Sequence, residues 1–260
     1  MRSAPSRTDA HNHVQRAYYA GDVWRNPRMR PVSSAYVNRL ADRLARFGDL
    51  SPSERILEVG CGMGKFTLPL LERGYALEGF DLSPDLLAEL RAHVPAGRTV
   101  RLHCGDALDP PATLRGTFDA VIGFFTLHHL IDLRTAFRAM RRYLRPGGRL
   151  IFLEPNAYNP LFYLQITLTP GMRWRAEKGL LRMTRRRFVA ALRDTGFHDI
   201  RCERFGMFPP AVTNRAFGPR LEDAIERLAI LRPVSAFQVV RATIPVGPSA
   251  HERGNPAERP

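Results

Sequence analysis

Lysine is nearly absent from this chain of 260 residues, although the chain is strongly basic. Lys65 and Lys178 are the only lysines among its 39 basic residues, and the formal net charge is +14. Basic surfaces attract nucleic-acid phosphate, but here the arginines are scattered along the whole chain. This favours a bias towards arginine across the whole proteome over a dedicated nucleic-acid surface. Two arginine clusters, at 138–142 and 182–187, leave an anionic-ligand patch open as an alternative.

Cysteine is also scarce, and its three positions lie far apart, at Cys61, Cys104 and Cys202. This spacing indicates neither a disulfide framework nor a zinc cluster, and we expect no metal site. No run of about 18 to 20 uncharged apolar residues could form a transmembrane helix. The first residues lack the apolar region of a secretory signal. We therefore expect a cytoplasmic protein.

The strongest signal in the chain is the run Ile-Leu-Glu-Val-Gly-Cys-Gly-Met-Gly at residues 56–64. Its apolar part predicts a buried parallel strand, and its glycines predict a sharp turn that lets backbone approach a ligand. We expect this turn to open a helix whose first amides favour an anionic group. A dinucleotide fingerprint would need glycine at position 65, and a Walker A loop would need Ser or Thr after Lys65. Lys65 and Phe66 therefore disfavour both.

A carboxylate should end the next strand, because neighbouring strands of a doubly wound sheet deliver an acidic side chain to ribose about 20 residues further on. Residues 75–81 read as that strand, and Asp81 follows Glu58 by 23 residues. Ser83 as N-cap and Pro84 at the first helical position predict that a helix follows. Pro69, inside the helix expected after the glycine turn, must lie in its first turn or kink it.

Three further strands are expected downstream, at 99–103, 118–123 and 150–154. Gly105-Asp106-Ala107 follows the first of them. The apolar spacing between 133 and 144 predicts a core helix, and Thr184 begins another helix that Gly196 closes.

These segments, in this order, resemble the motifs of class I S-adenosylmethionine (SAM) dependent methyltransferases, in particular the small-molecule, type 11-like group. The resemblance covers about residues 54–156 and includes the turn at 145–148. It implies an α/β fold with a doubly wound, seven-stranded, mostly parallel sheet, Rossmann-like, with helices on both faces. Strands near 198–203 and 236–242 would form the antiparallel pair of that sheet. The cofactor would be SAM, and its implied ligands are Glu58, Gly60, Cys61, Gly62, Gly64, Asp81, Leu82, Asp106, Ala107 and Phe124.

The implied reaction is methyl transfer from SAM to a small-molecule or lipid- or glycan-linked acceptor, at oxygen or nitrogen. His128 and His129 follow the fourth strand, and histidine suits a general base because its unperturbed pKa is about 6.5. They are the catalytic candidates, with His129 favoured as the base and His128 and Glu154 behind it. A SAM-binding protein without methyl transfer stays open. RNA methylation is a minor alternative, because residues 123–126 lack the Asp/Asn-Pro-Pro-aromatic tetrapeptide of enzymes that methylate base amino groups.

The expected organisation is one SAM-binding domain, residues 33–244, with variable segments around it. Residues 1–32 would be a partly disordered segment that can act as a lid, with Tyr18 or Tyr19 over the cofactor, and 245–260 a disordered tail. An insertion at about 155–183 is apolar and uncharged through residue 172. It is expected to be a lid, core packing or a transient membrane contact. The partner would be a small or lipid-like substrate, and nucleic acid is disfavoured.

Overall fold

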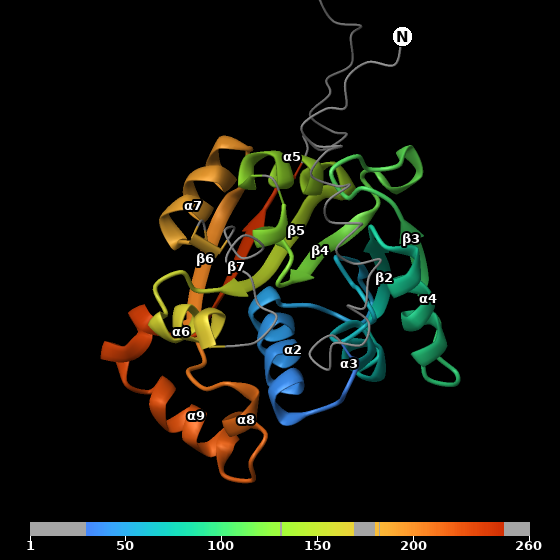
Figure 1. The fold of residues 1–260 in the computed structure, drawn as a ribbon. Helices are drawn as coiled ribbons and strands as arrows, with labels where there is room; N and C mark the ends of the chain where they lie inside the picture. Colours follow the sequence, from blue (N-terminus) through green and yellow to red (C-terminus); the bar gives the residue numbers. More distant parts are fainter. Residues whose placement is uncertain (1–29, 131, 169–179, 182, 247–260) are drawn as a thin grey trace, which may run out of the picture.

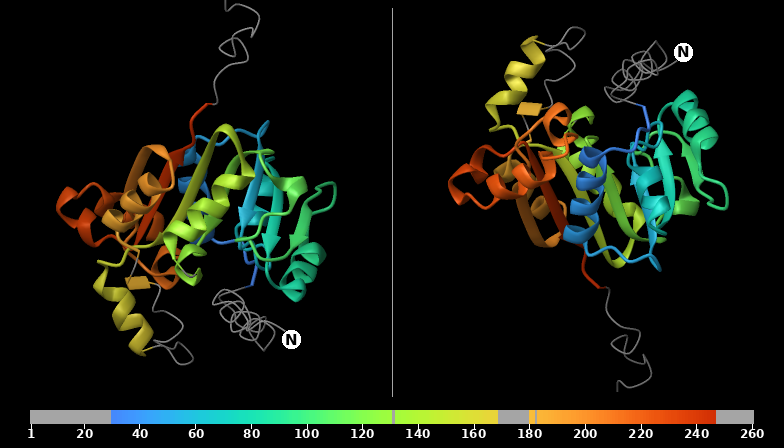
Figure 2. Two further views of the ribbon diagram at one scale, coloured as in Figure 1. Left: turned by 90° about the horizontal axis from the view of Figure 1, so that it is seen from above. Right: turned by 90° about the horizontal axis from the view of Figure 1, so that it is seen from below.

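The computed structural model describes residues 30–130, 132–168, 180–181 and 183–246, which fold into one seven-stranded sheet with helices on both faces (Figures 1 and 2). The strand order is β3-β2-β1-β4-β5-β7-β6. This confirms the doubly wound, mostly parallel α/β fold. The predicted lid tyrosines Tyr18 and Tyr19, the insertion residues 169–179 and the tail from 247 lie outside the described residues.

Every predicted strand is present, and β1 to β5 run parallel to one another. Ile56 in the centre of β1 pairs with Leu77 on one side and with Ala120 on the other. The fifth strand begins at Leu144, earlier than predicted, because Leu144 already pairs with Phe118 before an irregularity in the register. The bounds are β1 Arg55–Val59, β2 Ala76–Asp81, β3 Arg101–Cys104, β4 Phe118–Phe124 and β5 Leu144–Pro155.

The two remaining strands are β6 His198–Phe205 and β7 Phe237–Thr243. They are antiparallel to each other, as predicted. β7 lies between β5 and β6 and is antiparallel to both. The last of the described strands in sequence is therefore an interior strand of the sheet.

Side-chain caps determine where several helices begin. The hydroxyls of Ser34, Ser83 and Thr184 accept backbone N–H groups of the first turns of α2, α4 and α7, which satisfies donors that a helix start leaves unpaired. Gly196, with φ +79°, follows the end of α7. The bounds are α2 Ala35–Gly48, α3 Thr67–Glu72, α4 Pro84–His93, α5 Leu133–Tyr143, α6 Pro160–Leu168, α7 Arg185–Asp194, α8 Pro210–Thr213, α9 Gly218–Glu226, and the 3₁₀ turns η2 Ala112–Leu114, η3 Leu127–His129 and η5 Ala229–Val234.

The helix after the glycine turn differs from the expectation. α3 begins at Thr67, three residues after Gly64, and is only six residues long. Pro69 falls in its first turn, where a missing N–H costs nothing. The helix therefore starts three residues further from the glycines than the turn predicts, and the amides beside the glycines belong to a loop.

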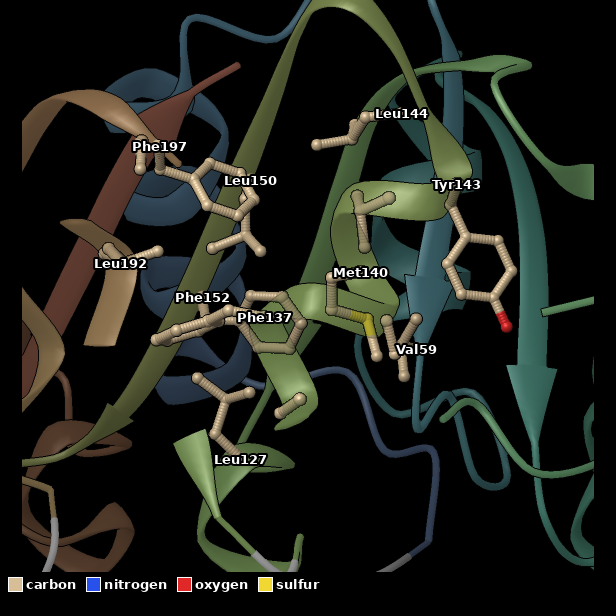
Figure 3. Close-up of a cluster of buried hydrophobic side chains, with 14 of the residues drawn as sticks. Val59, Leu127, Phe137, Met140, Tyr143, Leu144, Leu150, Phe152, Leu192 and Phe197 are labelled. Carbon is tan, nitrogen blue, oxygen red and sulfur yellow. The ribbon is translucent and has the colours of Figure 1, made fainter. Parts of the chain in front are cut away.

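Two apolar layers cover the sheet because successive side chains of each strand point to opposite faces. Figure 3 shows one layer, where Phe137, Met140 and Tyr143 of α5 lie beside Leu150 and Phe152. On the other face α2, α3 and α4 pack on side chains such as Ile56 and Ile151. Each fully buried Leu or Phe stabilises the fold by about 1.5 to 3 kcal/mol. None of the described helices is long and apolar enough to span a bilayer.

Candidate functional site

A cavity of about 290 Å³ lies at the carboxyl ends of β1, β2 and β4, together with the turn after β3. It faces the point where the chain order reverses, since β1 has β2 on one side and β4 on the other, and open α/β sheets bind ligands at such a point. Nine of the ten residues predicted to bind the cofactor line it, together with both candidate histidines. These are Glu58, Gly60, Cys61, Gly62, Asp81, Leu82, Asp106, Ala107, Phe124, His128 and His129.

The three glycines of the turn have different roles. All have positive φ, which only glycine adopts readily. A Cβ on Gly60 would lie 2.5 Å from the hydroxyl of Thr126, and a Cβ on Gly64 would lie 2.2 Å from Leu90. A Cβ on Gly62 would meet no protein atom within 4 Å. Gly60 and Gly64 are thus needed for packing, and Gly62 alone adjoins open space; Gly64 does not line the cavity.

Asp81 fastens the glycine turn to the end of β2. One carboxylate oxygen accepts the N–H of Gly62 at 2.8 Å, and the other accepts the N–H of Ser83 at 2.9 Å. Burial raises the pKa of Asp81, and these backbone donors oppose the rise. The Gly62 amide is therefore already paired with Asp81.

Glu58, at the end of β1, is a buried carboxylate that lines the cavity. The residue is only 2% exposed, and Oε2 has no hydrogen-bond partner among the described residues. Burial raises the pKa of Glu58 to about 8, and the nearby charge of Asp81 adds to the rise. A cation in the cavity would reverse this shift, because it favours the charged carboxylate.

Asp106 brings a third carboxylate to the same cavity from the turn after β3. Its Oδ1 accepts the N–H of Leu108 at 2.9 Å, and Tyr143 donates its hydroxyl to the carbonyl of Ala107 at 3.3 Å. The cavity wall therefore carries three acidic groups in a protein of net charge +14. Such a wall suits a ligand with positive charge and hydroxyl or amino donors.

An aromatic wall forms another side of the cavity. Phe124 stacks on Phe66, with ring centroids 4.1 Å apart and planes 9° apart. Phe125 has φ +54°, a conformation that is unfavourable for a bulky residue, and its ring contacts Phe66 and Phe237. Sequence reasoning missed Phe66 and Phe125 as lining residues, although paired phenylalanines at a strand end were a usable signal.

His128 is held by a buried glutamate of the neighbouring strand. Its Nδ1 lies 2.7 Å from Oε2 of Glu154, which is fully buried. The other oxygen of Glu154 accepts the N–H groups of Thr126 and Leu127 at 2.7 and 2.6 Å. A carboxylate can only accept, so Nδ1 carries the proton and Nε2 holds the lone pair in the neutral ring. Glu154 itself is thus placed to orient the histidine.

His129 lies against His128, with ring centroids 4.0 Å apart. Both belong to the 3₁₀ turn η3, which follows the carboxyl end of β4. His128 is more buried than His129 and has the anchored ring. The described residues contain no group of three His, Cys, Asp or Glu side chains that could hold a metal ion.

Known proteins match this chain in its central region. Residues 57–152 match the family model described as "Methyltransferase domain". Demethylmenaquinone methyltransferase of Corynebacterium urealyticum is 37% identical over 112 residues, which are 43% of this chain and 46% of that relative. The chain thus spans about half the length of the curated relatives it matches.

Two solved structures have the same fold. A SAM-dependent methyltransferase of Thermotoga maritima, a possible histamine N-methyltransferase, superposes with a TM-score of 0.55 at 20% identity, over 80% of this chain and 91% of that one. The [4+2]-cyclase SpnF superposes with a TM-score of 0.57 at 21% identity, over 94% of this chain and 98% of that one. Residues 57–152 are thus similar to the methyltransferase-domain family, and the chain shares the fold of these solved structures.

Proposed function

We propose that this protein binds SAM in the cavity and transfers its methyl group to a small or lipid-like acceptor, at oxygen or nitrogen. The proposal rests on one observation. Glu58, Asp81 and Asp106 line the same cavity, and the space beside Gly62 in it is open. SAM is a nucleoside that carries a sulfonium and an ammonium. The unpartnered carboxylate oxygen of Glu58 and the open Gly62 position fit such a cation.

Each carboxylate has a task that its position supports. Asp81 and Asp106 can accept hydrogen bonds from ribose hydroxyls and from the adenine amino group, while Glu58 faces the positive charge of the amino-acid end. When bound, the sulfonium supplies an electrophilic methyl group. The protein's part is to align the acceptor and to exclude water, which in favourable intramolecular cases is worth about 7 to 11 kcal/mol. The aromatic wall of Phe66, Phe124 and Phe125 supports this exclusion.

His128 is our choice of general base, with Glu154 as the residue that positions it. The Nδ1–H of His128 is held by a carboxylate that has no exposed surface, so the ring keeps one tautomer and one direction. Nε2 can then accept the proton of an acceptor hydroxyl. The sequence favoured His129, and the contact with Glu154 moves the preference to His128.

SAM binding is tested by titration calorimetry of wild type and of two matched variants. Asp81→Asn removes the charge that ends β2, whereas Asp85→Asn removes an exposed charge four residues later in α4. We expect Asp81→Asn to weaken binding of SAM and of its demethylated product at least about tenfold, because hydrogen bonds to charged groups contribute about 1.5 to 3 kcal/mol. Asp85→Asn should bind as wild type does. No SAM binding by wild type at millimolar concentration would refute the proposal.

The acceptor is tested with SAM that carries a labelled methyl group, incubated with the protein and a cell extract. Label in a small-molecule or lipid fraction supports the proposal, and label in RNA would favour the nucleic-acid alternative. A second function has its own support, because SpnF has this fold over 98% of its length and is a cyclase. SAM binding without transfer of label to any fraction would favour that class of SAM-binding protein.

A further inference from the structure

Large apolar side chains are exposed at one end of the molecule. The described residues expose eight of them, and five belong to three segments that meet beside β6 and β7. Ile230 is 85% exposed, the largest fraction of the eight. A soluble surface rarely gathers such groups without a partner. The five are Tyr158, Leu161, Leu181, Leu228 and Ile230.

Hydrogen bonds join the three segments into one surface. The side-chain amide of Asn156 donates to the carbonyls of Pro233 and Ser235 at 2.9 and 2.8 Å, and that of Asn159 donates to Val234 at 2.7 Å. The N–H of Ala157 donates to the carbonyl of Met183 at 3.1 Å. The start of α6 is thereby fixed to η5 and to the segment before α7.

Arginines surround these apolar groups. The guanidinium of Arg204 lies 5.3 Å from the ring centroid of Tyr158, and Arg227 and Arg232 are exposed on the same side. All three line an open hollow of about 880 Å³. None of them forms an ion pair with a carboxylate in the described part of the chain.

The acidic groups that border this hollow are already paired with arginines of α2. Arg39 holds Asp223 and Glu226, each at 2.7 Å, and Arg43 holds Glu226 and Glu203. These pairs connect α2 to α9 and to β6. The charges left for a partner are therefore these three arginines together with Arg185, which also lines the hollow, and the partner that complements them is anionic.

The cavity lies at the same end of the parallel strands as the start of α6. α6 follows the carboxyl end of β5, and the cavity lies at the carboxyl ends of the neighbouring parallel strands. Both therefore lie where the parallel strands end, and Figure 2 shows α6 projecting from the body on that side. Pro245, after β7, lies at the opposite end of the strands, where its carbonyl accepts the N–H of Gly147 near the start of β5.

We propose that this docking face, made of Tyr158, Leu161, Leu181, Leu228, Ile230, Arg204, Arg227 and Arg232, binds transiently to membrane surfaces that contain anionic lipids. The apolar side chains enter the interface between head groups and acyl chains, and the arginines pair with lipid phosphate. The role of this binding rests on the proposed function, because it would bring a lipid-like acceptor close to the cavity. The membrane binding itself does not depend on that function.

The test is sedimentation of the full chain with two kinds of vesicle, phosphatidylcholine alone and phosphatidylcholine mixed with phosphatidylglycerol. We expect binding to the mixed vesicles that weakens as salt is raised, and little binding to the neutral ones. Ile230→Ser should weaken binding at least about tenfold, from the lost burial of an isoleucine side chain. Arg232→Gln should weaken it about fivefold, because one arginine near an anionic surface contributes about that factor.

Two matched variants serve as controls. Val246→Ser changes another strongly exposed apolar side chain, 79% exposed, near the opposite end of the strands. Arg91→Gln removes an exposed arginine from α4, beside the far end of the sheet. Both should bind vesicles as wild type does, and all four variants should keep the affinity for SAM.

Three results would overturn the docking face. The first is equal binding to both kinds of vesicle, or to neither. The second is an equal loss of vesicle binding in Ile230→Ser and Val246→Ser. The third is a dimer in light scattering that Ile230→Ser dissociates, while vesicles do not bind. Failure of the proposed function is a separate observation, because it appears as lost SAM binding in calorimetry while vesicle binding persists.

Discussion

The buried carboxylate of Glu58 predicts an unusual dependence of stability on pH. Glu58 lines the cavity, is 2% exposed and has a pKa raised from 4.5 to about 8. The folded protein therefore holds a proton at this site that the unfolded chain releases near pH 4.5. Glu58→Gln keeps the shape of the protonated side chain and removes the titration, so it isolates the effect.

The direction and the magnitude of this pH dependence follow from the linkage between proton binding and folding. Between the two pKa values the folded state binds more protons than the unfolded state, so the free energy of unfolding falls as pH rises. The contribution is fully present below pH 4.5 and is lost as pH rises through about 8. One pKa unit corresponds to about 1.4 kcal/mol, so the whole shift corresponds to about 5 kcal/mol as an order of magnitude. At high pH the glutamine variant should be the more stable protein.

The assay is urea unfolding of both proteins at several values between about pH 5 and pH 9. The difference in free energy of unfolding, wild type minus Glu58→Gln, should decrease steadily over this range. Asp132→Asn is the control, because the pKa of Asp132 is lowered and its difference from wild type should stay constant above about pH 5. Parallel curves for wild type and Glu58→Gln would refute the reasoning.

Three further substitutions separate packing from ligand binding and chemistry. Gly64→Ala should lower the free energy of unfolding by at least about 2 kcal/mol, because its Cβ would lie 2.2 Å from Leu90 at a positive φ; urea unfolding measures this, and an unchanged midpoint would contradict it. Gly62→Ala should cost only about 1 kcal/mol of backbone strain but weaken SAM binding in calorimetry, and full affinity would exclude Gly62 from the site. Glu154→Gln should lower kcat more than the affinity for SAM and displace the pH profile assigned to His128, whereas an unmoved profile would leave Glu154 a purely structural role.

Much of the fold could be predicted because its signals are local. Apolar runs bounded by glycine or proline gave the five parallel strands, and the cap residues Ser83 and Thr184 marked helix starts to the residue. The early start of β5 could not be predicted, because Leu144 joins the sheet through its partner Phe118 and not through its own pattern. Residues 207–234 were also missed, since short helices such as α8 depend on contacts with α2, not on periodicity.

The candidate site likewise has residues that local sequence predicts and residues that it does not. The carboxylates Glu58, Asp81 and Asp106 were predictable because each ends or follows a strand whose direction is known. The pair of His128 and Glu154 was not, because 26 residues separate them and only the adjacency of β4 and β5 brings them to 2.7 Å. The distinction between Gly62 and its neighbours likewise needs the positions of Thr126 and Leu90, which no local sequence contains.

The interior position of β7 has a consequence for how the chain folds during synthesis. β5 and β6 both precede Phe237, yet neither pairs with the other, and each meets only β7 on that side. Until the ribosome has released residues 237–243, β5 presents an open edge and β6 has no sheet to join. Open strand edges attract other chains, so a nascent or truncated chain that ends before Phe237 should aggregate. Once β7 is made, it pairs with β5 and β6 and closes that edge.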